Sequence, residues 1–226
     1  KRQAGLILGI FSSGLPSLIT EVSSGIVIIV FNMIILGLAG NTGVAAYGVI
    51  ANLSLVVIAI YTGISQGIQP LMSSFYGAGN RKNINSILRY AMTAAVLISV
   101  AVYLTIYFGA DPIAAVFNSE QNPTLQSIAR QGLRIYFTGC IFAGFNIVLS
   151  VYFTSTDNPL PAHIISLLRG FILIIPLAFL LSALGKLLGV WAAFPVTELL
   201  VCLIGLGLFL KSSGVRHRSG SFPDLP

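Results

Sequence analysis

Apolar residues fill long runs of roughly 18 to 25 positions along this chain, and short polar joints separate the runs. Runs of this length suit helices that cross about 30 Å of hydrocarbon at about 1.5 Å per residue. The strict alternation of barrel strands is absent. The pattern predicts an all-α, polytopic membrane protein built as a six-transmembrane-helix bundle. The predicted spans are 14–38, 44–72, 86–109, 126–153, 160–184 and 187–211.

Polar segments mark the ends of these spans. The predicted joints are 39–43, 77–85, 111–123, 154–159 and 185–186. The last segment, 212–226, is polar and rich in Ser, Gly and Pro, a composition that buries little apolar surface. We therefore expect residues 1–211 to form one helical domain and 212–226 to be a disordered cytoplasmic tail.

Composition agrees with a membrane protein. Hydrophobic residues make up 56% of the chain and charged residues 8%, against about 25% charged in soluble domains. The basic residues then predict orientation. Eight of them lie on the side that both termini share, at Lys1, Arg2, Arg81, Lys82, Arg89, Lys211, Arg216 and Arg218, whereas Arg130, Arg134 and Lys186 flank the other side. Both termini are therefore expected in the cytoplasm, and the net charge of +6 is explained by topology and not by a nucleic-acid partner.

Glu21 is the one acidic or basic side chain between Arg2 and Arg81, and it lies inside the first apolar run. A carboxylate at bilayer depth costs about 2.5 kcal/mol or more unless it is paired, hydrated or protonated, so such a residue is a candidate functional site. Because no basic residue lies in its own or the next span, a purely structural ion pair is harder to form. We expect Glu21 to be a cation-coupling residue.

Two more charges lie inside spans, Arg169 in the fifth and Glu198 in the sixth. They are candidates for an intramembrane pair, and such a pair has two interpretations: a structural clamp between helices or part of a transport site. Helical spacing places small and polar residues beside the charges, which predicts faces turned toward a wet cavity. The predicted cavity-lining residues are Ser17, Ser24, Asn32, Asn52 and Gln66.

The sequence lacks the motifs of enzymes. No GxSxG, HExxH or P-loop pattern occurs, and His163 and His217 are too far apart for a metal-ligand spacing. Cys140 and Cys202 both fall inside spans and are best explained as small packing residues. We expect no covalent catalysis, no cofactor and no metal site.

One segment carries a family resemblance. The turn YGAGNRKNI at residues 76–84, with the helix before it from Gly63, resembles the long helix and cytoplasmic turn of the multidrug and toxic compound extrusion (MATE) family. The order of the other features agrees: Leu15-Pro16 before Glu21, the turn at 157–159, Arg169, and Val190-Trp191 before Glu198. The resemblance covers residues 5–211 and is strongest to the second half of the family's bacterial, MepA-like branch.

The resemblance implies an architecture. Family members have twelve helices in two six-helix lobes around a central cavity that opens alternately inward and outward. This sequence would be the second lobe, and the partner lobe would lie outside it. Glu21 matches an acid of the seventh helix that couples a cation in sodium-linked members, and Asn52 matches an asparagine of the eighth. Gly48 stands where some members have a cavity glutamine.

The sequence departs from the sodium-linked members in its fourth span. Their tenth helix carries a further acid, but residues 135–153 contain no Asp or Glu, and the matching position falls near Phe142 or Ala143. Glu21 is therefore better interpreted as a proton site than as half of a sodium site.

The resemblance implies a secondary antiporter of the inner (plasma) membrane. It would export cationic or amphipathic small molecules in exchange for H+ or Na+. Two alternatives stay open: a lipid-linked oligosaccharide flippase of the same superfamily, which would favour a more basic cavity, and a non-transporting membrane scaffold subunit in which the buried charges serve helix packing.

Overall fold

The computed structural model describes residues 2–218, with side chains described at Leu18 and from Glu21 to Ser212. The described chain is helical throughout, without strands. Its elements are α1 (Arg2–Gly77), α2 (Arg81–Phe117), α3 (Pro123–Tyr136), the 3-10 turn η1 (Phe137–Gly139), α4 (Cys140–Ser155), α5 (Pro159–Leu167), the π-helical turn η2 (Leu168–Ile172) and α6 (Ile174–Arg218).

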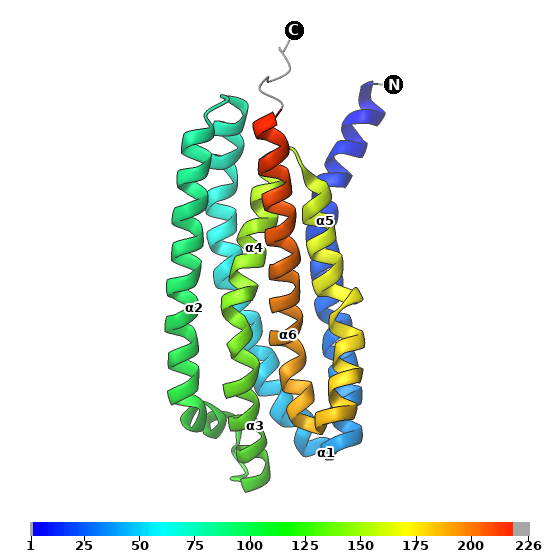
Figure 1. Ribbon diagram of the computed structural model, residues 1–226. Coiled ribbons are helices and arrows are strands. Elements are labelled where there is room, and N and C mark those ends of the chain that lie inside the picture. The colour runs from blue at the N-terminus through cyan, green and yellow to red at the C-terminus, as the bar shows by residue number, and fades with distance from the viewer. Residues whose placement is uncertain (1, 219–226) are drawn as a thin grey trace.

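Four helical stretches of the described chain are long and apolar enough to cross a membrane: Glu21–Gly77, Arg81–Phe117, Pro123–Ser155 and Pro159–Ser212. The first and last each contain a non-helical residue, Gly40 and Lys186, at which two helices meet. Figure 1 shows the chain reversing at both places, so the four stretches make six passes. The chain is a multi-pass membrane protein.

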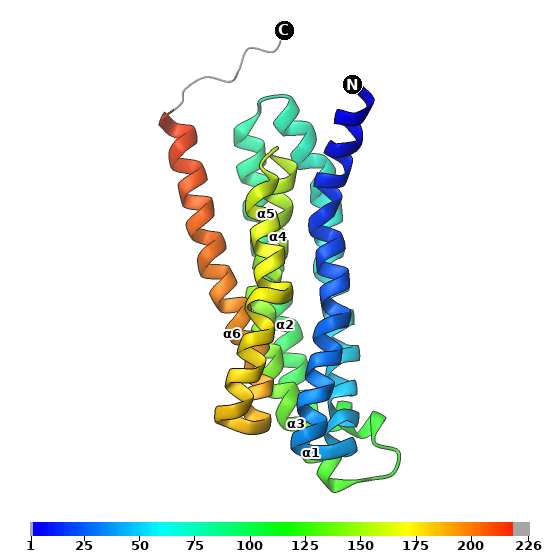
Figure 2. The same ribbon diagram turned by 90° about the vertical axis from the view of Figure 1, so that its right-hand side faces the viewer.

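Both ends of the described chain lie at one end of the bundle, together with the α1–α2 and α4–α5 turns (Figures 1 and 2). The turn at Gly40, the loop between α2 and α3, and the turn at Lys186 lie at the opposite end. Gly40 and Lys186 both fall in polar joints that the sequence pattern predicts. Gly40 has φ 62°, which a residue without Cβ adopts easily, whereas Lys186 adopts φ 50° with a side chain.

Asparagines begin two of the helices. The Asn80 side chain accepts a hydrogen bond from the backbone N–H of Asn83 at the start of α2. Asn122 accepts from the N–H groups of Thr124 and Leu125 at the start of α3. Each cap satisfies backbone donors that have no partner inside the helix, and Pro123 suits the first turn because it has no N–H to satisfy.

The fourth pass is divided by the 3-10 turn at Phe137–Gly139. A Cβ on Gly139 would meet the Phe194 ring at 2.8 Å and the backbone Cα of Pro195 at 2.9 Å. The fourth and sixth passes of the bundle thus leave room here only for a glycine between η1 and α6. The length of the fourth predicted span indicated tilt or a bend, but this contact was not evident from the sequence.

The fifth pass changes helix type around Arg169. In η2 the Leu173 N–H donates to the Leu168 carbonyl at 2.9 Å, a bond one residue longer than in an α-helix. Pro176 follows the wide turn, and proline cannot donate the bond that an α-helix requires four residues back. The wide turn lets the chain continue past that missing donor, and Arg169 lies within it.

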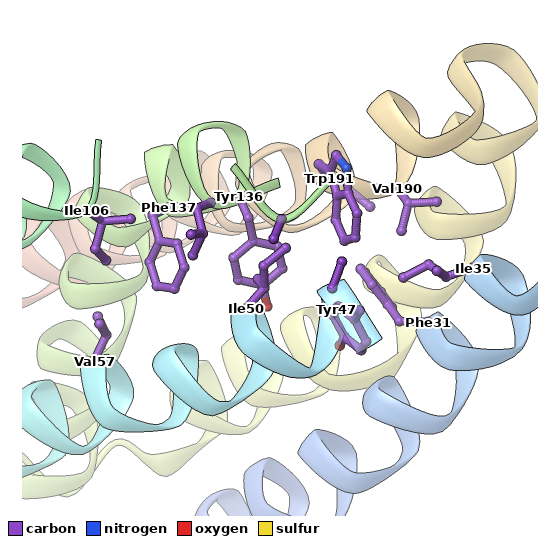
Figure 3. Packing of buried hydrophobic residues seen from close by; sticks show 14 of the residues in the cluster. Phe31, Ile35, Tyr47, Ile50, Val57, Ile106, Tyr136, Phe137, Val190 and Trp191 are labelled. Carbon is purple, nitrogen blue, oxygen red and sulfur yellow. The ribbon is translucent and has the colours of Figure 1, made fainter. Parts of the chain in front are cut away.

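The largest buried cluster joins aromatic and aliphatic side chains at the end of the bundle that holds Gly40 (Figure 3). Phe31 stacks on Tyr47 at 5.5 Å between ring centroids, and Tyr47 stacks on Trp191 at 6.2 Å. These three rings come from both halves of α1 and from α6. They join the first, second and sixth passes into one packed unit.

The prediction for the tail was wrong as far as Arg218. α6 runs to that residue, so the part of 212–226 that the structure describes is helical. Residues 212–218 continue the helix because they contain no proline, and their one glycine lowers helix stability by only about 1 kcal/mol. The remainder, 219–226, lies outside the described residues.

Candidate functional site

A cavity of about 740 Å³ lies between the passes. Its lining comes from both halves of α1, the end of α3, and from α4, α5, η2 and α6; α2 contributes nothing to the described lining. Its size falls in the range of small-molecule sites, about 300 to 1,000 Å³. The charged residues of the lining are Glu21, Arg169 and Glu198.

Glu21 is exposed on the wall of this cavity, on the first half of α1. Among the side chains that the structure describes, no basic group forms a salt bridge with it. Helical spacing places Ser24 and Ile28 on the same wall. The acid therefore faces the cavity and not a basic partner among the described side chains.

Arg169 and Glu198 form a buried ion pair. The Arg169 Nη2 and the Glu198 Oε1 are 2.8 Å apart, and the Arg169 Nε donates to the same oxygen at 3.1 Å. The side chains are 11% and 3% exposed, so solvent screens this pair weakly. The structure thus brings together the two intramembrane charges that the sequence suggested as partners.

Asn146 on α4 completes the cluster. Its Nδ2 donates to the Glu198 Oε2 at 2.7 Å and to the Glu198 backbone carbonyl at 2.9 Å. Asn146 is fully buried, and its Oδ1 has no hydrogen-bond partner. Sequence reasoning missed this residue because it searched the fourth span for acids only. A buried amide inside an apolar run is the signal that could have found it.

Aromatic rings form part of the cavity wall. Tyr47, Tyr136 and Phe194 all line it. Tyr136 and Phe194 stack face to face, with ring centroids 4.3 Å apart and an angle of 7° between planes. Tyr47 also stacks on Phe31 and on Trp191, so these rings pack mainly on one another and give the wall an apolar, rigid part beside the carboxylates.

The predicted lining residues divide into three groups. Ser24 and Gln66 line the cavity as expected. Asn32 and Asn52 are absent from the described lining. The side chain of Ser17 lies outside the described residues.

The positions of these two asparagines have physical explanations. Along the first half of α1 the lining ends near Ile28, and one turn later Phe31 packs on Tyr47 and closes the wall before Asn32. Asn52 is exposed, and its Nδ2 donates back to the Gly48 carbonyl at 2.8 Å. Its amide is therefore occupied locally, on the helix face that one and two turns later carries Leu55 and Ala59 of the cavity lining.

Comparison with known proteins identifies the family. The family model MatE matches residues 16–180, which is most of the chain. The chain belongs to the MATE family. The expected likeness to the MepA type is also found, since MepA multidrug export proteins are among its relatives.

Two curated relatives show how much of a longer sequence this chain matches. "Multidrug export protein MepA" of Staphylococcus haemolyticus is 26% identical over 209 residues, which are 92% of this chain and 44% of the relative. "FAD transporter" of Shewanella oneidensis is 24% identical over 163 residues, 71% of this chain and 35% of the relative. The chain spans less than half the length of these relatives.

Solved structures show the same fold. An outward-facing multidrug resistance MATE transporter of the MOP superfamily superposes with a TM-score of 0.84 at 20% identity, covering 93% of this chain and 48% of that chain. An inward-facing MATE transporter gives 0.84 at 19% identity, covering 92% and 48%. The six-pass bundle thus has the fold of about half of each of these transporters.

Proposed function

We propose that this chain forms one six-helix lobe of a twelve-helix MATE antiporter that exports cationic or amphipathic small molecules in exchange for H+ or Na+. The observation that carries the proposal is the cavity of about 740 Å³ with Glu21 exposed on its wall. Family membership and the names of the relatives support it.

Charge counting favours a cationic ligand. Arg169 and Glu198 neutralise each other within their pair, so Glu21 leaves the described lining with one net negative charge when all three are ionised. Cations also interact favourably with the faces of Tyr and Phe rings, at about 0.5 to 2 kcal/mol each. Phe194 is the partly exposed ring of the wall, with one face covered by Tyr136. Few directional bonds are involved, which permits broad specificity.

Coupling requires an acid whose affinity for an ion differs between the two states of the transporter. Glu21 faces open cavity in this structure and would be shielded from water when the cavity closes around it. A tenfold proton gradient supplies about 1.4 kcal/mol and a potential of 100 mV about 2.3 kcal/mol per charge. Each is large enough to bias a two-state equilibrium by one decade or more.

The proposed function also specifies a partner lobe, a membrane and an orientation for this chain. The partner is a second six-helix lobe that closes the cavity, since the chain covers 48% of each transporter that it superposes on. The protein lies in the plasma membrane with the ends of this lobe in the cytoplasm, because the Arg81–Lys82 turn lies at the same end as the termini. The neutralised state of Arg169 gives no support to a flippase with a basic cavity.

Ethidium efflux from cells that express the full-length protein tests the proposal. We expect lower ethidium accumulation than in cells carrying an empty vector, and restored accumulation when the ion gradient is collapsed. Accumulation that does not change with expression would contradict drug export and favour the scaffold or flippase interpretation. Membrane fractionation and immunoblotting confirm equal expression of the samples.

A further inference from the structure

We propose that Glu198, Arg169 and Asn146 form a second proton-binding site of this lobe, at which a proton on Glu198 replaces Arg169 as the partner of the carboxylate. The inference rests on the proposed transport function, because it gives the coupling proton another site in the same cavity. The hydrogen bonds that define the site do not depend on which molecule is exported.

The two oxygens of Glu198 have different partners. Oε1 accepts from the Nε and Nη2 of Arg169, whereas Oε2 accepts from the Nδ2 of Asn146. A buried carboxylate that loses its cationic partner becomes neutral more readily than it stays charged. Departure of Arg169 therefore implies proton uptake by Glu198, and arrival of Arg169 implies release.

Asn146 fits both charge states of Glu198. A primary amide has two N–H donors and one carbonyl acceptor. In the ionised state its Nδ2 donates to the carboxylate, and its Oδ1 is left buried without a partner. A proton taken up at Oε1, the oxygen that Arg169 releases, leaves Oε2 as the carbonyl oxygen of the neutral acid. The Asn146 Nδ2 therefore keeps its hydrogen bonds to Oε2 and to the Glu198 backbone carbonyl in the neutral state.

The Arg169 side chain can turn toward the cavity when Glu198 is neutral. Its guanidinium has five N–H donors, and its hydrogen bonds to Glu198 use two of them. The side chain is 11% exposed and lines the cavity that Glu21 also lines. It lies in the π-helical turn η2, and such turns occur often at functional sites. A change of rotamer would turn the guanidinium toward this cavity, where Glu21 is the other carboxylate of the lining.

The proton balance is simple. A proton from cavity water forms an O–H bond on Glu198, and Arg169 stays protonated throughout. The three charged residues of the lining then change from a net charge of −1 to 0 with Glu21 ionised. The cavity therefore holds a cation less strongly when the site is protonated, which is the relationship that exchange of a cation for a proton requires.

Several titratable groups surround Glu198, and they come from different elements. Arg169 belongs to η2, Tyr136 to the end of α3, Cys140 to α4 and Cys202 to α6. Tyr136 and the two cysteines interact electrostatically with the Glu198 carboxylate. From α1, Glu21 shares the cavity. Glu198 and Glu21 are the carboxylates of this group, so a carboxyl signal can be assigned with two substitutions.

Infrared spectroscopy of the purified full-length protein tests the site, because a protonated carboxyl group has a carbonyl band separate from that of a carboxylate. Arg169→Gln is expected to show such a band at neutral pH, and Arg169→Gln/Glu198→Gln is expected to lose it. Adding Asn146→Ala to Arg169→Gln is expected to move the band to higher wavenumber, because the carboxyl group loses a hydrogen bond. Asn32→Ala, at an asparagine outside the cavity lining, is the matched control and should leave the band in place.

Absence of the band in Arg169→Gln, or a band that Asn146→Ala leaves unmoved, would overturn the inference. If the arginine variant does not fold, acid titration of the wild-type protein replaces it. A band that appears on acidification and is lost in Glu198→Gln supports the site, and a titration indistinguishable between the two proteins overturns it. The spectra require no transport, so failure of ethidium export and failure of this site are separate outcomes.

Discussion

Arg169 donates two hydrogen bonds to the same oxygen of Glu198, from Nε at 3.1 Å and from Nη2 at 2.8 Å, and leaves the other oxygen to Asn146. The carboxylate of one helix is thereby held by side chains from two others, η2 and α4. Each partner lies far from Glu198 in sequence, so this contact fixes how the fourth, fifth and sixth passes meet beside the cavity.

Replacing Arg169 alone is expected to destabilise the fold more than replacing Arg169 and Glu198 together. Arg169→Met leaves Glu198 with Asn146 as its remaining partner, at a cost of up to about 3 to 5 kcal/mol that proton uptake by Glu198 reduces, whereas Arg169→Met/Glu198→Leu is expected to recover most of that loss. Unfolding of the purified proteins in detergent, followed by circular dichroism, measures the difference. A single variant as stable as the double variant would show that the pair does not bear on stability.

Gly139 is expected to tolerate no side chain. A Cβ there meets the Phe194 ring and the Pro195 backbone, so Gly139→Ala should lower the free energy of unfolding by about 1 to 3 kcal/mol. Gly207→Ala is the matched control, because a Cβ at Gly207 has no neighbour within 4 Å. Thermal unfolding of both variants checks the difference. Equal midpoints would contradict the close approach of η1 and α6.

Lys186 carries backbone strain that a substitution can release. Its φ of 50° and ψ of −131° lie outside the regions that residues with a Cβ favour, at a cost of about 1 to 3 kcal/mol. Lys186→Gly should therefore raise stability, and Lys186→Ala, which removes the same charge but keeps Cβ, should not. If both variants unfold at the same temperature, the gain does not come from the backbone.

Cysteine labelling in whole cells tests the orientation of the lobe. Lys82 and Glu120 are both exposed and lie at opposite ends of the bundle. In a background without Cys140 and Cys202, Lys82→Cys should react with a membrane-impermeant maleimide only after the cells are opened. Glu120→Cys should react in intact cells. The reverse pattern would place the termini outside and contradict the proposed orientation.

The breaks between passes were predicted from the sequence more successfully than the polar contacts were. The joints around Gly40 and Lys186 are visible because a polar or glycine-rich interruption in an apolar run is a local property. The two intramembrane charges, Arg169 and Glu198, were visible for the same reason, since a charge inside a span needs a partner.

The parts that escaped prediction depend on contacts between distant residues. Asn146 was missed because its importance comes from the position of Glu198 on another helix. The division of the fourth span at η1 follows from the approach of Phe194 and Pro195 to Gly139. The bond from the Asn52 amide to the Gly48 carbonyl on its own helix was not predicted either.

The most direct test of the central claim uses Glu21→Gln in the full-length protein, assayed by ethidium transport into inverted membrane vesicles under an imposed pH or sodium gradient. This substitution keeps the size of the side chain and removes its charge, and folding should be intact because Glu21 is exposed on the cavity wall. Asn52→Ala is the control variant, because Asn52 is absent from the described cavity lining. We predict that wild-type and Asn52→Ala vesicles accumulate ethidium when a gradient is applied and that Glu21→Gln vesicles do not. Gradient-driven transport by Glu21→Gln at the wild-type rate would contradict the account.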